Sequence, residues 1–282
     1  VLQDFIDRAP DDMARAKYAA ARERSVGLGV MGFHSFLQAN RIPFEGVMAK
    51  VWNKRMFTRI KEGVDAASKV LAEERGPCPD AADYGFNERF SNKTAIAPTA
   101  SISIITGGTS PGIEPIAANS FTHKTLSGSF NVRNRHLTKL LEQKGRNDDD
   151  TWSSIVTNGG SVQHLDFLSD DEKDVFKTAF EIDQRWVIEH AGDRAAMIDQ
   201  AQSVNLFLPA DVHKRDLHGL HLMAWKHGVK SLYYCRSLSI QRAEKAEVVS
   251  LLPGKVLDVL TLDQVATNAQ EENQYEECLA CQ

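Results

Sequence analysis

Residues 97–119 read APTASISIITGGTSPGIEPIAAN, a run that mixes β-branched residues with Gly and Pro. This composition predicts short strands joined by ordered loops over residues 94–118. Within the run, Pro98–Ser103 offers small residues whose backbone N–H groups can approach an anion closely, and Thr and Ser hydroxyls as further donors. The segment suits a diphosphate, although an ordinary β-turn with hydroxyl caps has the same composition.

Sequence on both sides of this run is typical of helices. Apolar residues at helical spacing predict a long amphipathic helix over residues 45–75, ended by Gly76-Pro77. Ser169, followed by three acidic residues, is a typical helix start. Further helices are predicted over residues 9–24, 183–200 and 211–227, and strands over residues 204–208 and 229–234. Helices alternating with short apolar strands favour an α/β architecture.

The composition excludes several classes of protein. The 282 residues carry a formal net charge of −5, so no basic excess attracts a nucleic-acid backbone. No apolar run approaches the roughly 20 residues that cross a bilayer, and no signal peptide is recognisable. Four cysteines are few for a secreted disulfide scaffold of this length, so we expect a cytoplasmic protein. The first residue is Val1, which favours a fragment or a processed piece.

Gly27, Gly29 and Gly32 match the spacing of a dinucleotide-binding fingerprint. Such a fingerprint needs a preceding strand and an acidic residue about 20 positions further on. A basic, helix-like run precedes these glycines, and Glu45 lies too near. We therefore interpret them as sites of close packing, with a dinucleotide-dependent oxidoreductase as a weak alternative.

Two adjacent phenols, Tyr233 and Tyr234, close the predicted strand 229–234. Neighbours in a regular strand point to opposite faces, so one ring in the core and one at the surface is the ordinary arrangement. Adjacent phenols could instead relay a radical, because a phenol can lose an electron and a proton together. If the two rings stack, the backbone must depart from regular strand geometry.

A pair of cysteines, Cys278 and Cys281, forms a C-x-x-C motif near the end of an acidic, polar segment over residues 263–282. Zinc sites usually need two such pairs. A dithiol on a flexible tail suits thiol–disulfide exchange, although two unrelated exposed cysteines would look the same.

Together, and in this order, five segments resemble the large subunit of class I ribonucleotide reductase: residues 24–33 (RSVGLGVMGF), 97–119, 203–209 (SVNLFLP), 227–234 (HGVKSLYY) and 278–282 (CLACQ). The resemblance implies the C-terminal part of a ten-stranded α/β barrel. Residues 1–255 would belong to the barrel and residues 256–282 to a flexible tail.

The resemblance also implies roles for individual residues. Thr99, Ala100, Ser101, Ile102 and Ser103 would bind the diphosphate of a ribonucleoside diphosphate. Tyr233 would face the catalytic cysteine and Tyr234 the small subunit, so that the pair relays a radical. Cys278 and Cys281 would re-reduce the active-site disulfide and then be reduced by thioredoxin or glutaredoxin.

Other parts of the family pattern have no match in this sequence. The Asn-x-Cys-x-Glu loop that carries the thiyl cysteine is missing, as are the two cysteines of the substrate-linked disulfide. ATP and deoxynucleotide effectors would bind the N-terminal part, and the radical-generating dinuclear metal centre would lie in the partner small subunit, so we expect no cofactor in this chain. Cys78 and Cys235 receive no role from the resemblance and are interpreted as structural.

Three interpretations remain open for such a chain. It could be a split large subunit that assembles with a separate N-terminal chain, a truncated record of a full-length enzyme, or a non-catalytic module that binds the small subunit. Half a barrel exposes strand edges and apolar surface, so we expect the isolated chain to aggregate or to need a partner.

Overall fold

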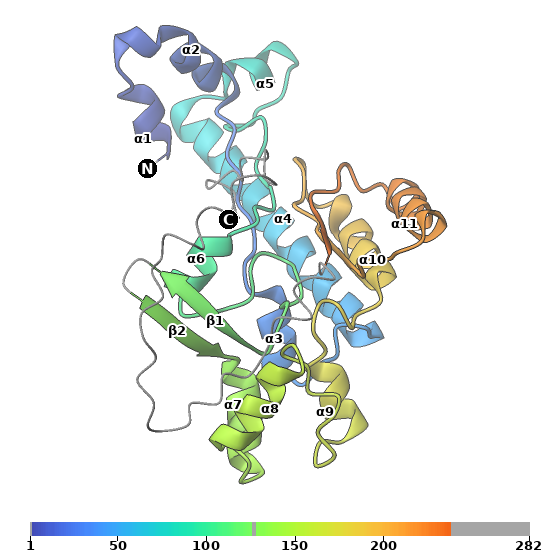
Figure 1. Cartoon of the computed structure of the whole chain (residues 1–282). Coiled ribbons are helices and arrows are strands. Elements are labelled where there is room, and N and C mark those ends of the chain that lie inside the picture. The colour runs from blue at the N-terminus through green and yellow to red at the C-terminus, as the bar shows by residue number, and fades with distance from the viewer. Residues whose placement is uncertain (1, 126–127, 238–282) are drawn as a thin grey trace, which may run out of the picture. The chain divides into compact units, whose positions relative to one another are not determined.

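The computed structural model describes residues 2–125 and 128–237. Helices dominate and the strands are short (Figure 1). In chain order the elements are α1 (Leu2–Asp7), the 3₁₀ helix η1 (Asp11–Met13), α2 (Ala14–Glu23), α3 (Phe33–Ala39), α4 (Val47–Arg75), α5 (Pro79–Asp83), α6 (Ala100–Ile105), β1 (Ser120–Thr125), β2 (Gly128–Arg133), α7 (Arg135–Gln143), α8 (Asp149–Thr157), α9 (Asp170–Val175), α10 (Gln184–Ala195), β3 (Leu206–Leu208), α11 (Lys214–Lys226) and β4 (Cys235–Ser237). The predicted tail, residues 256–282, lies outside the described residues.

Four extended segments pair side by side in parallel. Leu28 bridges Thr94, Ile96 bridges Gln202, and β3 pairs with β4 in the register Leu206 to Cys235. Helices connect the successive segments, with α4 in the first connection and α11 in the last. Parallel neighbours require such crossovers. Repeated strand–helix units around one ladder are the α/β architecture that the sequence predicts.

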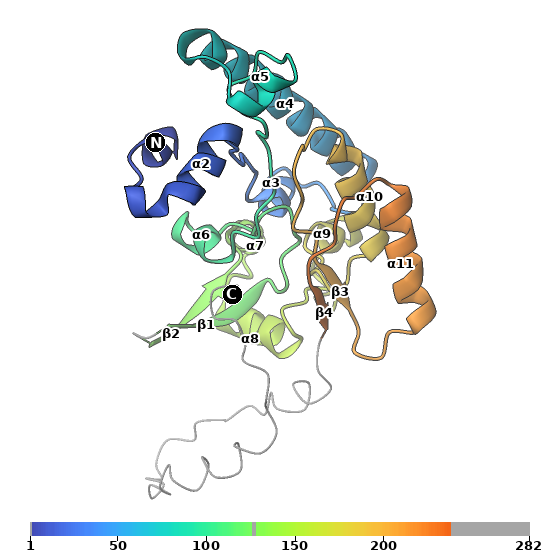
Figure 2. The ribbon, with the colours of Figure 1, turned by 90° about the horizontal axis from the view of Figure 1, so that it is seen from above.

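Among the connecting helices, α10 packs directly on strand β3 of the ladder. Helix α10 packs against both α4 and α11 (Figures 1 and 2). The largest buried cluster joins aromatic residues near α3 to the ladder and α10, and it includes Phe33, Phe44, Phe57, Ile96 and Val187. A separate cluster holds α7, α8 and α9 together around Leu137, Leu141 and Trp152.

A buried polar network also joins α4 to α10. The guanidinium of Arg194 donates to Gln202 Oε1 at 2.6 Å and to Asn53 Oδ1 at 3.0 Å. Burial lowers the pKa of Arg194 to about 9. Because the charge is satisfied by amide oxygens instead of a carboxylate, the helix contact depends on both amides staying in place.

Several predicted helix boundaries are confirmed. The long helix begins at Val47 and ends at Arg75, and Gly76 follows it with a φ of 77° that favours glycine. Ser169 caps α9 in a capping box with Glu172. Predicted helix 183–200 is shorter than expected, because α10 ends at Ala195.

Two strand predictions differ from the structure. Of the short strands and loops expected over 94–118, Thr94 and Ile96 do form β-bridges, but residues 100–105 form helix α6. Thr99 adopts a left-handed φ of 55° that turns the chain, and Gly107, with a φ of 98°, follows the helix end. Residues 229–234 are also not a strand, since β4 begins only at Cys235. The antiparallel hairpin of β1 and β2 was not predicted.

Candidate functional site

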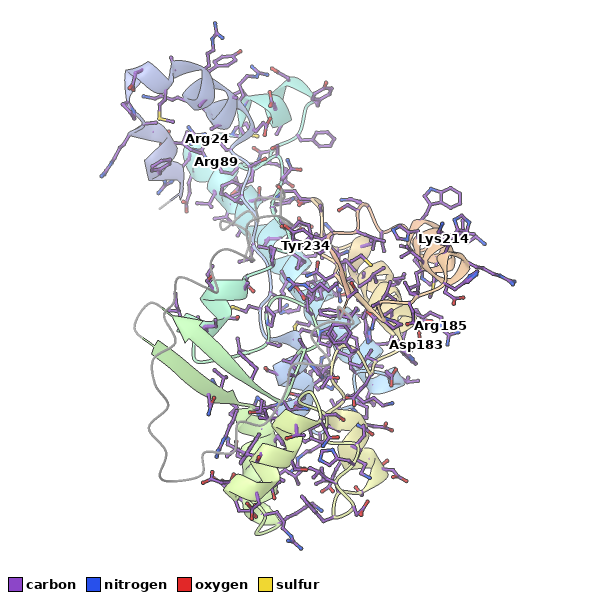
Figure 3. The ribbon with its side chains drawn as sticks, viewed as in Figure 1. Arg24, Arg89, Asp183, Arg185, Lys214 and Tyr234 are labelled. Carbon is purple, nitrogen blue, oxygen red and sulfur yellow. The ribbon has the colours of Figure 1, made fainter. Side chains whose placement is uncertain are left out.

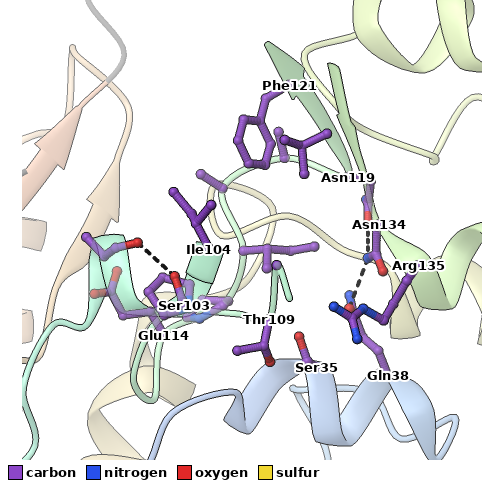
Figure 4. A pocket seen from close by; sticks show the side chains of 18 of the residues that line it. Ser35, Gln38, Ser103, Ile104, Thr109, Glu114, Asn119, Phe121, Asn134 and Arg135 are labelled. Carbon is purple, nitrogen blue, oxygen red and sulfur yellow. Dashed lines mark hydrogen bonds between the residues drawn. The ribbon is translucent and has the colours of Figure 1, made fainter. Parts of the chain in front are cut away.

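A cavity of about 630 Å³ lies where α6, the β1–β2 hairpin and the β3–β4 ladder meet. Figure 4 shows Ser103 and Glu114 on one side of it and Asn134, Arg135 and Gln38 on the other. Apolar side chains such as Ile104, Phe121 and Phe207 complete the lining. An apolar cavity with a few convergent polar groups is the usual form of a small-molecule site.

The predicted anion-binding segment forms the first turn of α6. Thr99 is the N-cap residue, and its Oγ1 accepts the N–H of Gly112 at 2.7 Å. Ser103 donates its hydroxyl to Ala100 O at 2.8 Å. The first N–H groups of a helix have no acceptor within it, and they carry the positive end of its dipole. The turn therefore presents N–H groups, while the Thr99 and Ser103 hydroxyls hold its shape.

Not every residue of the predicted segment faces the cavity. Ala100 and Ser103 line it. The side chains of Ser101 and Ile102 are exposed to solvent. The segment thus contributes to the cavity through its helical turn, a geometry that the expected strand and loop would not have given.

Glu114 is a buried carboxyl group in the cavity wall, 6% exposed. Burial raises its pKa, an effect that the hydrogen bond from Asn205 and the charge of Arg236 partly oppose. Asn205 Nδ2 donates to Glu114 Oε1 at 2.7 Å. The carboxyl group is therefore held inside the protein by an amide and not by an ion pair.

Asn134 holds the opposite wall. Its Nδ2 donates to Asn119 Oδ1 at 2.8 Å and to Gln38 Oε1 at 3.0 Å. Its Oδ1 accepts the N–H of His136 at 3.0 Å and so caps α7. Burial, followed by the charge of Arg135, lowers the pKa of His136. One side chain thus joins α3, the hairpin and α7 beside the cavity.

The two adjacent tyrosines lie on the ladder next to this cavity. Their ring centroids are 4.1 Å apart with an angle of 47° between the planes, and each residue is 41% exposed. Rings this close cannot point to opposite faces, so the backbone departs from regular strand geometry here, and the two rings are tilted against each other and not stacked in parallel. Figure 3 labels Tyr234. The guanidinium of Arg236, which lines the cavity, lies 5.9 Å from the ring centre of Tyr234.

The glycines that match the dinucleotide-binding fingerprint lie at sites of close packing, as the sequence analysis predicts. A Cβ at Gly29 would lie 2.3 Å from the carbonyl oxygen of Ala95, and one at Gly32 would lie 2.5 Å from Thr109 Oγ1. In the part of the chain that the structure describes, Leu28 pairs with Thr94 of a neighbouring ladder segment, and α3 begins at Phe33, directly after Gly32. Gly29 therefore lets two backbones approach each other, whereas Gly32 leaves room for the Thr109 side chain and has a left-handed φ of 83°.

The four cysteines have different positions. Cys78 is buried, which fits the interpretation that it is structural, whereas Cys235 is exposed on β4 and does not fit it. Cys278 and Cys281 lie outside the described residues. Within residues 2–125 and 128–237, no group of three His, Cys, Asp or Glu side chains is placed to hold a metal ion. None of the helices in these ranges combines the length and apolar character that crossing a bilayer requires.

Sequence reasoning missed three residues of the site: Glu114, Asn205 and Arg236. Glu114 and Asn205 stand inside motifs quoted for the resemblance, and a single acidic residue within the apolar run 97–119 was the one available signal. Their contact joins positions 91 residues apart, which no local pattern reveals.

Comparisons with known proteins point to one family. The family described as ribonucleotide reductase, barrel domain, matches residues 1–88 and 80–235. The ribonucleoside-diphosphate reductase large subunit of Invertebrate iridescent virus 6 is 51% identical over 248 residues, which are 86% of this chain and 26% of that protein. The putative large subunit of Frog virus 3 is 39% identical over 285 residues, which cover 100% of this chain and 46% of that protein.

A solved structure has the same fold. The α subunit of the Actinobacillus ureae class Id ribonucleotide reductase superposes with a TM-score of 0.76 at 40% identity, over 84% of this chain and 44% of that one. The chain spans between about a quarter and a half of the length of these relatives. With the parallel ladder, its helical connections and a family match over most of its length, the chain belongs to the ribonucleotide reductase barrel-domain family and has part of that α/β barrel as its fold.

Proposed function

We propose that this chain is the C-terminal part of the large subunit of a ribonucleoside-diphosphate reductase. In the complete reaction the 2′-hydroxyl of a ribonucleoside diphosphate leaves as water and hydrogen takes its place. A dithiol supplies two electrons and two protons and becomes a disulfide. The observation that carries the proposal is the position of the tyrosine pair, on the ladder that also forms a wall of the cavity next to α6.

The first turn of α6 would hold the diphosphate. Thr99, Ala100, Ser101, Ile102 and Ser103 place the start of α6 and the positive end of its dipole at the cavity, without a lysine or arginine in the turn. The bond from Gly112 to Thr99 fixes the turn before the ligand arrives, so little conformational freedom is lost on binding.

Tyr233 and Tyr234 would relay a radical from the small subunit toward the substrate. Rings 4.1 Å apart are close enough for an electron to pass directly between them. Each ring is partly exposed, so Tyr234 is accessible to a docking partner. We assign the dinuclear metal centre that generates the radical to that small subunit.

The remaining chemistry would come from other segments. Cys278 and Cys281 would pass reducing equivalents from thioredoxin or glutaredoxin to the active-site disulfide. The thiyl cysteine, its acid–base glutamate and the effector sites would be provided by the N-terminal part of the large subunit. Catalysis therefore requires this chain together with that part.

Reduction of cytidine diphosphate tests this proposal. The chain is mixed with a cognate N-terminal fragment, the small subunit and a thiol reductant, and the same mixture without the fragment serves as the blank. Turnover is expected only in the complete mixture. The Tyr233→Phe variant should abolish turnover, because phenylalanine has no ionisable hydroxyl and cannot form the relay radical at this step.

Tyr18→Phe is the matched control, since Tyr18 on α2 is 67% exposed and far along the chain from the cavity. It should leave turnover unchanged. Stable association of the two halves without turnover would contradict the proposal and would favour a non-catalytic module that binds the small subunit.

A further inference from the structure

The cavity contains a buried carboxyl group for which the proposed reaction gives no role. Glu114 is 6% exposed, and Asn205, its hydrogen-bond donor, is 1% exposed. Burying a carboxyl group costs free energy unless hydrogen bonds replace those it made to water. A second hydrogen bond of Asn205 indicates what the Glu114–Asn205 pair does in the structure.

Asn205 connects Glu114 to the main chain of Tyr234. The N–H of Tyr234 donates to Asn205 Oδ1 at 2.9 Å. Since a backbone N–H can only donate, Asn205 must turn its oxygen toward Tyr234 and its NH₂ toward Glu114. The orientation of the amide is therefore fixed by its two partners, and the carboxyl oxygen of Glu114 must be the acceptor.

Main-chain bonds, more than burial, hold the tyrosine pair. Tyr233 N–H donates to Val204 O at 2.8 Å, and Leu206 N–H donates to Tyr234 O at 2.9 Å. Both rings remain 41% exposed, so packing alone cannot set their direction. The bond from Tyr234 N–H to Asn205 Oδ1 links the main chain of the pair to a side chain, and through that side chain to the cavity wall.

Glu114 is itself anchored to the turn that supports α6. Its N–H donates to Pro111 O at 3.1 Å, and Gly112 in the same turn donates to Thr99 Oγ1 at 2.7 Å. The carboxyl group therefore has a fixed position relative to the first turn of α6. A rigid support of this kind can place a second group accurately.

We propose that Glu114 and Asn205 are positioning residues that set the main chain of Tyr234, and with it the close contact of the two tyrosine rings, for radical transfer. This inference rests on the proposed function for its kinetic consequence. Its structural content, the dependence of the Tyr234 ring on the Glu114–Asn205 bond, stands independently.

Exchanging the two polar groups tests the bond itself. Asn205→Asp keeps an acceptor for Tyr234 N–H but sets a second carboxylate against Glu114, so the link should break. In the double variant Glu114→Gln with Asn205→Asp, the new amide donates to the new carboxylate and the link is restored in reverse.

Two measurements on the full chain report the effect of these substitutions. In the complete reductase mixture, Asn205→Asp should lower kcat by roughly 10- to 100-fold with KM nearly unchanged, because misplacement of a reacting group affects turnover. The double variant should recover most of that loss. In ¹⁹F NMR of the fluorotyrosine-labelled chain, Asn205→Asp should shift the Tyr234 resonance and leave that of Tyr18 in place, and the double variant should return it.

Glu181→Gln is the matched control, the same exchange at a carboxylate that bonds Ser161 and Thr178 away from the cavity. It should change neither kcat nor the Tyr234 resonance. An Asn205→Asp chain with unchanged kcat and an unchanged Tyr234 resonance overturns the inference, as does a double variant that recovers nothing. If the unchanged chain gives no turnover at all, the proposed function fails, and the resonance alone still decides whether the bond positions the ring.

Discussion

Single atoms decide how closely the segments of the ladder approach each other. At Gly29 a side chain would meet a carbonyl oxygen, Ala95 O, which belongs to a neighbouring ladder segment and cannot rotate away. At Gly63 in α4, by contrast, a Cβ meets nothing within 4 Å. Two glycines of one chain thus differ sharply in what alanine would do.

The change Gly29→Ala should lower the free energy of unfolding by roughly 1–3 kcal/mol, because the ladder must shift to accept the methyl group. Gly63→Ala should raise it by about 0.5–1 kcal/mol, since alanine is the better helix former. Urea unfolding followed by circular dichroism measures both. Equal effects at the two sites would refute the close-packing role of Gly29.

At the same scale, the sequence singled out the turn at the start of α6 and the tyrosine pair as candidates, but not the residues that contact them from elsewhere in the chain. A short motif is visible because its residues are consecutive. Glu114 and Asn205 meet only when the turn after α6 and the start of β3 are brought together, so their role depends on tertiary contacts. The same holds for Arg236 beside Tyr234.

Helices were predictable where the periodicity was long and the end signals were clear. The long amphipathic pattern and Gly76 define α4, and the cap residues define the start of α9. Short elements were not predictable. Residues 100–105 have strand-like composition but form α6, because Thr99 and the glycines that follow impose turns at both ends.

The hairpin of β1 and β2 was missed for a related reason. The sequence around the two strands lacks the Asn-Gly type of signal that marks two-residue hairpin turns. Helix α7 could have been recognised from Leu137, Leu140 and Leu141, all of which are buried. The N-cap residue of α7, Asn134, also donates to Gln38 and Asn119, so the contribution of these bonds to stability can be tested by substitution.

The change Asn134→Ala should lower the free energy of unfolding by about 2–4 kcal/mol. It removes a helix cap, worth about 1 kcal/mol, and leaves the buried oxygens of Asn119 and Gln38 without their donor, which costs a further 1–3 kcal/mol. Ser169→Ala at the start of α9 removes a cap without such links and should cost only about 1 kcal/mol. Urea unfolding compares the two. Equal losses would show that the links across the cavity wall contribute nothing to stability.

For the molecule as a whole, two buried histidines determine how its stability responds to acid. Burial lowers the pKa of His34 to about 3 and that of His190 to about 4. Neither His34 Nε2 nor His190 Nδ1 has a hydrogen-bond partner in the described part of the chain. Both rings are therefore neutral in the folded protein at pH values where they are charged in the unfolded chain.

The stability of the folded state should fall as the pH drops from about 6.5 toward 4. In this window the unfolded chain binds protons that the folded protein does not, so the stabilisation is complete above the unfolded pKa and is lost toward the folded pKa. Each histidine contributes up to about 1.4 kcal/mol per pH unit. Urea unfolding between pH 7 and pH 4.5 measures the slope.

His190→Gln retains a donor for Phe44 O and removes one proton site, so it should flatten the slope by about 1.4 kcal/mol per pH unit. His218→Gln, at an exposed position of α11, should leave the slope unchanged. Identical slopes in all three chains would show that the buried histidines do not govern acid stability.

Cys235 has a practical consequence for studying this molecule. It is an exposed thiol one residue from Tyr234, whereas Cys78 is buried. With Cys278 and Cys281 replaced by serine, a maleimide dye or a nitroxide would attach at one defined point beside the tyrosine pair. Cys235 is thus a native site for labelling. The docking of a second protein could be observed there as quenching of the dye's fluorescence, or as a distance between the nitroxide and a second spin label.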